Sequence, residues 1–295
     1  MKGLLSHKIF DTILLFLLVF SSGGVLFVFN RNTFSVLFLF LCVYAVFIVG
    51  KEIKKNIFNT AIISFVFINI IFILNYFFSD GDQIYLKYGF HLMNIFSCFL
   101  LFVYFINNRT RLYFMQRIRF VFRVILVYSL INFFAYVIIG DSLTQVIYNI
   151  EKSMMTFHYL FFYNPDKSIF EILGIQFVRN QGWFWEPGIN QIYLNLLLYL
   201  EGFVFKKNRW ILLLVVFTIL TTYSTTGILI MFFILFFIFK SSIKKNPLLV
   251  FIALLLIFPS YQIVKSNVQD KLDTSSFQKR YFDLVQTLSI TADYP

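Results

Sequence analysis

The chain has 295 residues, of which 59% are hydrophobic and only 13% are charged. A typical globular domain is about 45–50% apolar and about 25% charged, and its surface must be covered with polar groups. The composition therefore excludes a soluble domain and predicts an all-α, polytopic helical bundle in a membrane. The net charge of +11 does not indicate nucleic-acid binding, because the basic residues form short clusters between apolar runs.

The apolar runs predict about nine membrane-spanning helices, since a crossing needs about 20 mainly apolar residues. In chain order they cover residues 8–29, 33–50, 57–78, 88–106, 118–139, 188–205, 210–222, 226–239 and 247–264. The first run is too long for a signal-peptide core and is expected to remain as a helix. The segment 210–239 is too long for one crossing, so a break is expected at the hydroxyl-rich residues 221–227.

Basic residues mark alternate loops, which predicts a cytoplasmic N-terminus. The loops then placed inside hold Lys2, Lys8, Lys51, Lys54, Lys55, Arg109, Arg111, Arg117, Arg119, Lys206, Lys207, Arg209, Lys240, Lys244 and Lys245. The short outer loops hold only Arg31 and Lys87. This asymmetry also supports the two short spans on either side of residues 221–227.

Four regions follow from this topology. Residues 1–139 are a five-helix membrane region, residues 140–187 a long extracytoplasmic loop, residues 188–264 a four-helix membrane region, and residues 265–295 the start of a second large extracytoplasmic segment. The two long outer segments carry most of the acidic residues, so chemistry is expected on the outer face. The sequence stops without a closing helix, which suggests C-terminal truncation.

The most informative segment is Arg-Asn-Gln-Gly-Trp-Phe-Trp-Glu-Pro-Gly at 179–188, where the long loop leads into a helix. Pro187 suits a first helical turn, and Glu186 then lies at the positive end of the helix dipole. Arg179 offers a planar guanidinium to phosphate or carboxylate. The alternative is structural: Glu186 caps the helix, Arg179 pairs with it, and Trp183 and Trp185 anchor the membrane interface.

Several other polar residues can be interpreted either as functional or as structural. Ser224 and Thr225 lie in the break between two short helices, which marks either a binding site or a tight polar turn. Asn190 lies in a predicted helix, where an amide joins helices or lines a site. Arg280 and Asp283 are three residues apart, so they form a helical pair, or Arg280 is a second phosphate ligand.

No motif for a metal, a nucleotide or another cofactor is present in the sequence, and neither cysteine has metal-ligand spacing. His158 is a lone histidine in the long loop and is a weak candidate for a catalytic base. Ionisable residues are scarce within the predicted helices, which counts against a proton-coupled transporter.

The pattern Arg179-x-x-Gly182 followed by Glu186-Pro187-Gly188 resembles the O-antigen and capsular polysaccharide polymerases and the related O-antigen ligases. The segment from Thr222 to Gly227 is similar to that family's Thr-x-Ser-Arg/Thr-Gly turn, with Thr225 where many members have arginine. Arg280-x-x-Asp283 resembles the stretch that leads to its Pro-x-x-Gly-x-Gly segment. The resemblance covers roughly residues 179–295.

The resemblance implies a metal-independent glycosyltransferase of the bacterial cytoplasmic membrane that builds surface polysaccharide on its outer face. The donor and acceptor are glycans on undecaprenyl diphosphate, and flippase or chain-length regulator proteins are possible partners. Arg179 and Arg280 would stabilise the leaving diphosphate, while Glu186 would orient or deprotonate the acceptor hydroxyl. Trp183, Trp185, Asn190, Ser224, Thr225 and Asp283 would bind substrate.

Three alternatives remain open at this stage. A ligase performs the same chemistry but transfers the glycan to a lipid core. A transporter or flippase of lipid-linked sugars would need a hydrated central cavity and repeat symmetry, and the sequence shows neither. A structural membrane subunit would make the Arg179 and Glu186 motifs incidental.

Overall fold

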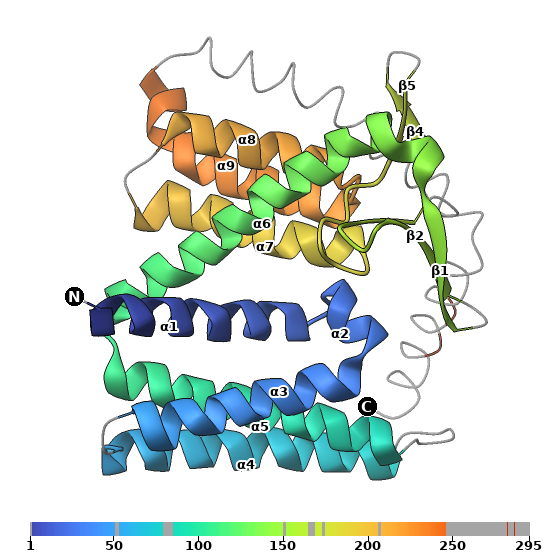
Figure 1. Ribbon diagram of the computed structural model, residues 1–295. Helices are drawn as coiled ribbons and strands as arrows, with labels where there is room; N and C mark the ends of the chain where they lie inside the picture. Colours follow the sequence, from blue (N-terminus) through green and yellow to red (C-terminus); the bar gives the residue numbers. More distant parts are fainter. Residues whose placement is uncertain are drawn as a thin grey trace. The chain divides into compact units, whose positions relative to one another are not determined.

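The computed structural model describes residues 2–50, 53–78, 85–149, 152–164, 169–172, 175–205 and 208–245, together with 282 and 286. The chain divides into two compact units, Met1–Asn190 and Gln191–Pro295. Figure 1 shows helices as the main element of both units and a group of short strands in the first. The predicted ninth span, 247–264, lies outside the described residues.

The first unit is built on apolar helices. They are α1 (Lys2–Ser21), α2 (Val25–Phe29), α3 (Arg31–Tyr44) with its π-helical continuation η1 (Ala45–Val49), α4 (Lys55–Phe78), α5 (Tyr85–Asn108) and α6 (Arg111–Ile139). The α5 helix packs against α3 and α4, and α1 packs against α3 and α6. The α1 helix also contacts α5.

The first predicted span is not one continuous helix, so the prediction for residues 8–29 is wrong on this point. The α1 helix ends at Ser21, and α2 begins at Val25 after a tight turn. Gly23 has φ +138°, which glycine adopts far more easily than other residues. The hydroxyl groups of Ser21 and Ser22 donate to the carbonyl oxygens of Leu18 and Val19, which completes the end of the helix.

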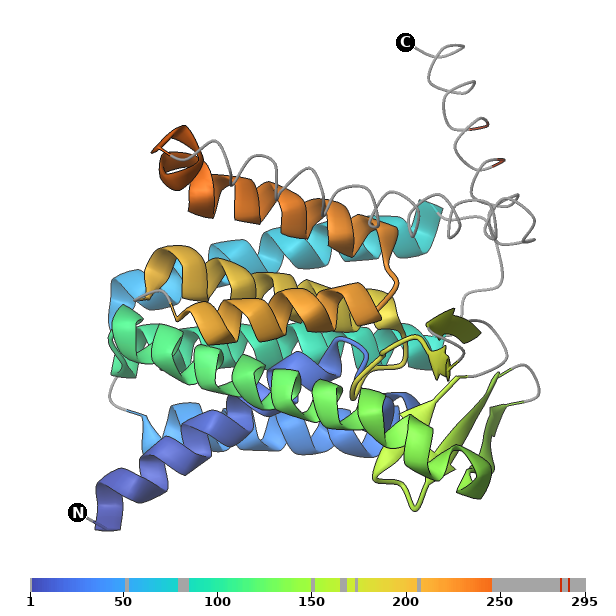
Figure 2. The ribbon, with the colours of Figure 1, turned by 90° about the horizontal axis from the view of Figure 1, so that it is seen from above.

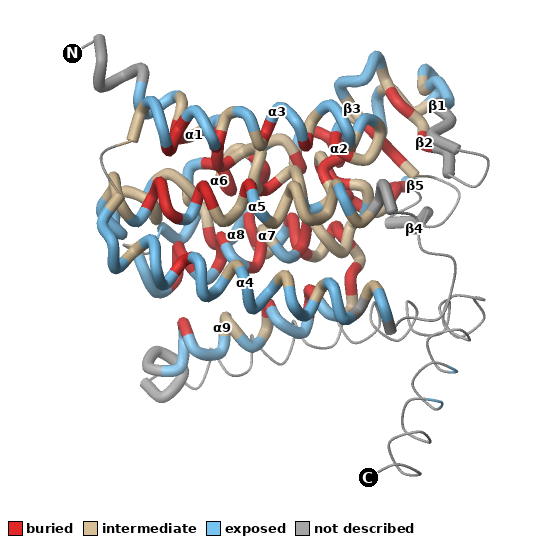
Figure 3. The backbone as a smooth tube through the Cα atoms, turned by 90° about the horizontal axis from the view of Figure 1, so that it is seen from below, coloured by how far each residue is buried: buried red, intermediate tan, exposed pale blue. Residues whose placement is uncertain are grey.

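Four helices in the described part of the chain are long and apolar enough to cross a membrane. They lie within Arg31–Val49, Lys55–Leu74, Tyr88–Asn108 and Arg111–Ser142. The α4 helix shows the expected lipid-facing character most clearly, because Ile63, Phe67 and Phe77 are 68%, 63% and 72% exposed. Figure 3 shows this exposure along much of α4. Such apolar exposure is stable in lipid rather than in water.

Five short strands occupy the segment between α6 and α7 (Pro187–Tyr199), so the all-α prediction is wrong there. The strands β1 (Thr144–Asn149), β2 (Lys152–Phe157) and β3 (Phe161–Tyr163) form one antiparallel sheet, while β4 (Ile169–Ile172) and β5 (Ile175–Val178) form another. Seen from above, β1 follows the C-terminal end of α6 (Figure 2). The sheets pair backbone groups that a loose loop would leave to water, and their β-branched and aromatic residues favour strands.

An ion pair with a buried carboxylate ties α1 to the connection between α5 and α6. Asp11 is fully buried, and its carboxylate accepts from Nε of Arg109 at 2.7 Å. The hydroxyl groups of Tyr104 and Tyr113 each donate to the same carboxylate at 2.8 Å. Both carboxylate oxygens therefore have charge-assisted or hydroxyl donors, which makes this burial tolerable.

The second unit contains the remainder of α7, the π-helical turn η4 (Leu200–Val204), α8 (Arg209–Thr221) and α9 (Thr225–Lys245). The break expected within residues 221–227 is confirmed, since α8 ends at Thr221 and α9 begins at Thr225. Tyr223 has φ +52° in this turn. The amide of Asn195 donates to the carbonyl oxygen of Gly227 at 3.1 Å, which joins α7 to the start of α9.

Candidate functional site

The segment that links β5 to α7 is held against the turn between α1 and α2 by its backbone. The N–H of Trp185 donates to the carbonyl oxygen of Gly23, and the N–H of Val25 donates to the carbonyl oxygen of Trp183, both at 2.9 Å. Gly24 and Phe184 form the antiparallel bridge between these two bonds. The serine–glycine break that ends α1 thus supplies a free backbone edge on which the segment rests.

Side-chain amides fix the beginning of the same segment. The amide of Asn180 donates to the carbonyl oxygen of Ser129 at 3.0 Å, and its Oδ1 accepts from the N–H of Gly182 at 3.1 Å. Asn190 donates to the carbonyl oxygen of Asn180 at 3.3 Å and accepts from the hydroxyl of Ser129 at 3.2 Å. Asn180 and Asn190 are almost completely buried, so this network joins α6, the segment and the first turns of α7.

Position 182 requires glycine for two reasons, its backbone conformation and the lack of room for a Cβ atom. Its φ is +56°, in the left-handed region. A Cβ at this position would lie 2.5 Å from the Oγ of Ser129 and 3.0 Å from the side-chain amide atoms of Asn190. The glycine of the Arg179-x-x-Gly182 pattern is therefore fixed by the amide network.

Trp183 packs between aromatic side chains of α1 and α6. Its ring stacks on Tyr128 with a centroid distance of 3.8 Å and an interplanar angle of 21°, and it meets Phe20 edge-on at 5.6 Å. The hydroxyl of Tyr128 donates to the carbonyl oxygen of Leu160 at 2.6 Å. This arrangement holds the indole ring while leaving it only partly buried.

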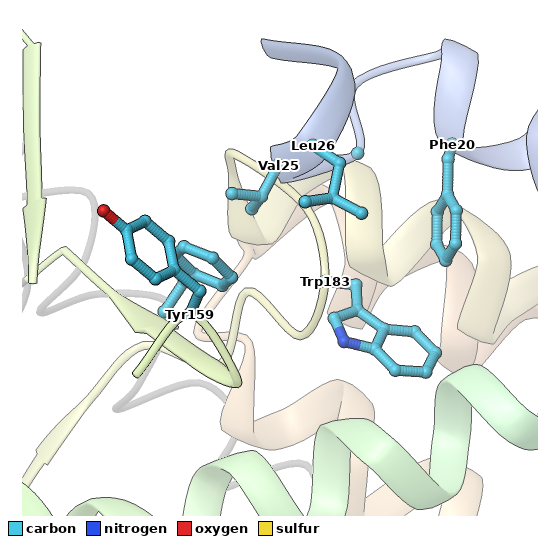
Figure 4. A pocket seen from close by; sticks show the side chains of 7 residues that line it. Phe20, Val25, Leu26, Tyr159 and Trp183 are labelled. Carbon is cyan, nitrogen blue, oxygen red and sulfur yellow. The ribbon is translucent and has the colours of Figure 1, made fainter. Parts of the chain in front are cut away.

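Trp183 also lines an aromatic pocket of about 190 Å³, whose other walls include Phe20, Leu26, Tyr159 and Phe162. Figure 4 shows Trp183 and Phe20 on one side of this pocket and Tyr159 on the other. A cavity of about 150 Å³ with similar apolar walls can hold a benzene molecule. The pocket is therefore large enough for one sugar ring or a short isoprenoid segment.

The wall that carries Tyr159 is a strained turn between β2 and β3. His158 and Tyr159 have φ values of +47° and +59°. This left-handed conformation costs about 1–2 kcal/mol per residue for residues other than glycine. The hydroxyl of Thr156 stabilises the turn by accepting from the N–H of Tyr159 at 3.1 Å and donating to the carbonyl oxygen of Phe161 at 2.8 Å. Strain of this kind is often retained where a side chain is presented to a ligand.

A buried phenol, that of Tyr163, supports the sheet behind this turn. Tyr163 donates to the carbonyl oxygen of Asn132 on α6 at 2.8 Å. Burial, reinforced by the neighbouring Tyr136, raises the pKa of the Tyr163 phenol. The hydroxyl therefore stays protonated as a donor and keeps β3 attached to α6.

The two charged residues of the pattern lie at opposite ends of the segment. Arg179 is half-buried directly after β5, and Glu186 is exposed immediately before α7. The carbonyl oxygen of Glu186 accepts from the N–H groups of Ile189 and Asn190 at the start of the helix. The Glu186 carboxylate makes no hydrogen bond or ion pair with the described residues. Its structural interpretation as a side-chain cap therefore finds no support.

The remaining candidates occupy varied positions. Trp185 is half-buried, meets Phe29 edge-on at 6.3 Å and packs on the small cluster of Val25, Met154 and Phe162. Ser224 is buried, and its hydroxyl accepts from the N–H of Gly227 at 3.5 Å as a helix cap. Thr225 is half-buried in the first turn of α9. His158 is exposed in the strained turn. Arg280 and Asp283 lie outside the described residues.

The structure adds Gln181 to the candidates from sequence. Gln181 is 1% exposed, and neither polar atom of its side chain has a hydrogen-bond partner among the described residues. Leaving such a group unpaired costs about 1–3 kcal/mol. The Asn-Gln-Gly triplet is a turn signal in the sequence, but burial of its middle side chain depends on packing that the sequence does not reveal.

The described residues contain no cluster of three or more histidine, cysteine, aspartate or glutamate side chains that could hold a metal ion. The segment from Arg179 to Glu186 itself carries a guanidinium, a carboxylate, amides and aromatic rings. These groups suit recognition of an anion and a sugar or lipid.

These observations define a mostly helical protein with apolar helices of membrane-spanning length. Its segment from Arg179 to Glu186, which follows the strands, is held in place by hydrogen bonds to the α1–α2 turn and to α6. No family model matches the chain, and no curated protein and no solved structure is similar to it at a significant level.

Proposed function

We propose that the protein polymerises oligosaccharide repeat units carried on undecaprenyl diphosphate, at the outer face of the bacterial cytoplasmic membrane. The observation that carries the proposal is the construction of the segment from Arg179 to Glu186. A backbone bridge and a buried amide network brace it, yet the Glu186 carboxylate remains exposed and unengaged by the described residues. A segment that served only to connect β5 to α7 would not need this support.

The reaction transfers a glycan from a diphosphate to a hydroxyl group. The acceptor oxygen forms a bond to the anomeric carbon, the bond from that carbon to the diphosphate oxygen breaks, and the diphosphate leaves with the electron pair. The hydroxyl proton passes to Glu186 or to water. Negative charge grows on the leaving group as the bond breaks. A guanidinium next to the diphosphate therefore stabilises the transition state more than the ground state, which lowers the barrier.

Arg179 is the group that would meet the diphosphate. Its guanidinium keeps its charge at any working pH and can bind two phosphate oxygens at once. Arg280 would supply a second guanidinium, as the family resemblance implies. Glu186 would orient the acceptor hydroxyl, and we place this role ahead of proton abstraction because the helix N-terminus stabilises the ionised carboxylate.

The groups near Arg179 and Glu186 fit the rest of such a substrate. The partly buried face of Trp183 and the exposed Tyr159 line an apolar pocket suited to a sugar face or the first isoprene units. The amide of Gln181, which has no hydrogen-bond partner among the described residues, would gain hydrogen bonds from a substrate hydroxyl. Asn190 and Trp185 would contribute by shaping the site, and Asp283 by pairing with Arg280.

Reconstitution tests the proposal directly. Purified protein in proteoliposomes is given lipid-linked repeat units, and the products are separated on a gel. The proposal predicts a ladder of lengthening glycans without added metal. Transfer to a lipid core without chain growth would indicate a ligase instead, and movement of the substrate across the bilayer without any transfer would indicate a transporter.

A further inference from the structure

A second cavity lies in the first unit, along α5 on the side of Arg109. Its volume is about 540 Å³, and its walls come from α1, α5 and the start of α6. Cys98, Phe102, Phe105 and Arg109 lie on it at intervals of three or four residues, so they form one stripe of the helix. We call this cavity the α5 groove.

The α5 groove has the length of one lipid leaflet. From position 98 to position 109 the helix rises by about 16 Å at the standard increment. The hydrocarbon core of a bilayer is about 30 Å thick, so this length is about half of it. Leu18, Phe102, Ile106 and Phe114 make the walls apolar over that distance.

One end of the groove is cationic. Arg109 and Arg111 both line it. Asp11 already neutralises Arg109 through the 2.7 Å ion pair. Arg111 is exposed, and its side chain makes no hydrogen bond or ion pair with the described residues. The sequences of α5 and α6 contain no aspartate or glutamate, so nothing on these two helices opposes a negative ligand at this end.

We propose that the α5 groove binds an anionic diacyl phospholipid, with one acyl chain along Phe102 and Ile106 and the phosphate group at Arg111. An apolar channel of leaflet length that ends at an uncompensated cation matches an amphiphile with a negative head group. A free anion would gain nothing from the apolar walls, and a neutral lipid would gain nothing from Arg111. This proposal does not depend on the proposed glycosyl transfer.

Cys98 provides a reporter within the groove. It is a partly buried free thiol on the wall, whereas Cys42 is fully buried. Purified full-length protein in detergent is treated with a small apolar maleimide, and mass spectrometry follows modification at position 98. The added probes are phosphatidylglycerol, phosphatidylcholine with the same chains, a polyprenyl phosphate and inorganic phosphate.

The proposal predicts that phosphatidylglycerol slows modification of Cys98 at about five-fold lower concentration than phosphatidylcholine, since one arginine near a membrane contributes about that factor. Arg111→Gln should remove this preference, whereas Arg111→Lys should keep it. Arg209→Gln is the matched control and should change nothing, because Arg209 is likewise an exposed first residue of a helix that directly follows a capping residue.

Filling the groove tests the acyl chain separately. Ile106 is 48% exposed on the groove, and Ile131 is 53% exposed on α6 without lining it. Ile106→Trp should abolish protection by both phospholipids, while Ile131→Trp should not. Equal protection by the two phospholipids, protection by inorganic phosphate, protection by the polyprenyl phosphate alone, or an equal effect of Arg111→Gln and Arg209→Gln would each overturn the assignment.

Discussion

The indole of Trp183 stacks on the phenol of Tyr128, with 3.8 Å between ring centroids. Trp183 belongs to the segment from Arg179 to Glu186 that links β5 to α7, and Tyr128 belongs to the long helix α6. The stack therefore fixes the segment that holds Arg179 and Glu186 against a rigid element. Precise placement of catalytic groups generally depends on support of this kind.

Trp183→Ala is expected to lower the free energy of unfolding by about 2–3 kcal/mol, because the buried part of the indole and its stacking contact with Tyr128 are both lost. Thermal unfolding in detergent measures the change. Trp210→Ala is the control, since Trp210 is 77% exposed and should have little effect. Equal shifts for the two variants would show that the stack contributes nothing to stability.

Gly182→Ala should destabilise the protein by about 2 kcal/mol or more. The new methyl group would approach the Oγ of Ser129 to 2.5 Å, and the residue would keep a left-handed backbone. Gly188→Ala is the matched control, because nothing lies within 4 Å of its Cβ position. It should be neutral or stabilising by up to about 1 kcal/mol in the first turns of α7.

Asp11→Ala should cost about 3–5 kcal/mol, since it leaves Arg109 without its buried counter-ion. Tyr104 and Tyr113 would lose an acceptor at the same time. A double-mutant cycle with Arg109→Ala separates the pair from the individual losses. A coupling near zero would contradict the view that this pair ties α1 to the connection between α5 and α6.

Glu186→Gln should leave stability within about 0.5 kcal/mol of the parent, because the carboxylate is exposed and has no partner among the described residues. Glycan chain growth should nevertheless fall by about ten-fold or more, if the carboxylate orients the acceptor hydroxyl. Asp141→Asn is the control, as another exposed carboxylate. Growth at the parent rate would remove Glu186 from the reaction.

The length of the apolar runs predicted most helices well. The predicted spans at residues 57–78 and 118–139 both end where α4 and α6 end, at Phe78 and Ile139. The break before Thr225 was also predictable, because the hydroxyl run is too polar for the middle of a spanning helix. The helical break at Ser22 to Gly24 was missed, since its two serines and two glycines lie inside an otherwise apolar run.

The strands and the support of the candidate site were not predictable in the same way. Residues 144–178 alternate too weakly to separate strands from a loop, and their pairing depends on contacts with α6, such as Tyr163 with Asn132. Arg179, Gly182 and Glu186 could be selected by residue type and spacing. The roles of Tyr128 and Ser129 arise only through tertiary contacts with residues about 50 positions away.

The most direct test of the account is chain growth by Arg179→Lys in proteoliposomes supplied with lipid-linked repeat units. Lysine keeps the charge but loses the planar pair of donors, so growth should fall by about 100-fold or more, while Arg31→Lys should grow glycans at the parent rate. Full-length polymer at the parent rate from a folded Arg179→Lys protein would contradict the assignment of Arg179 to the diphosphate.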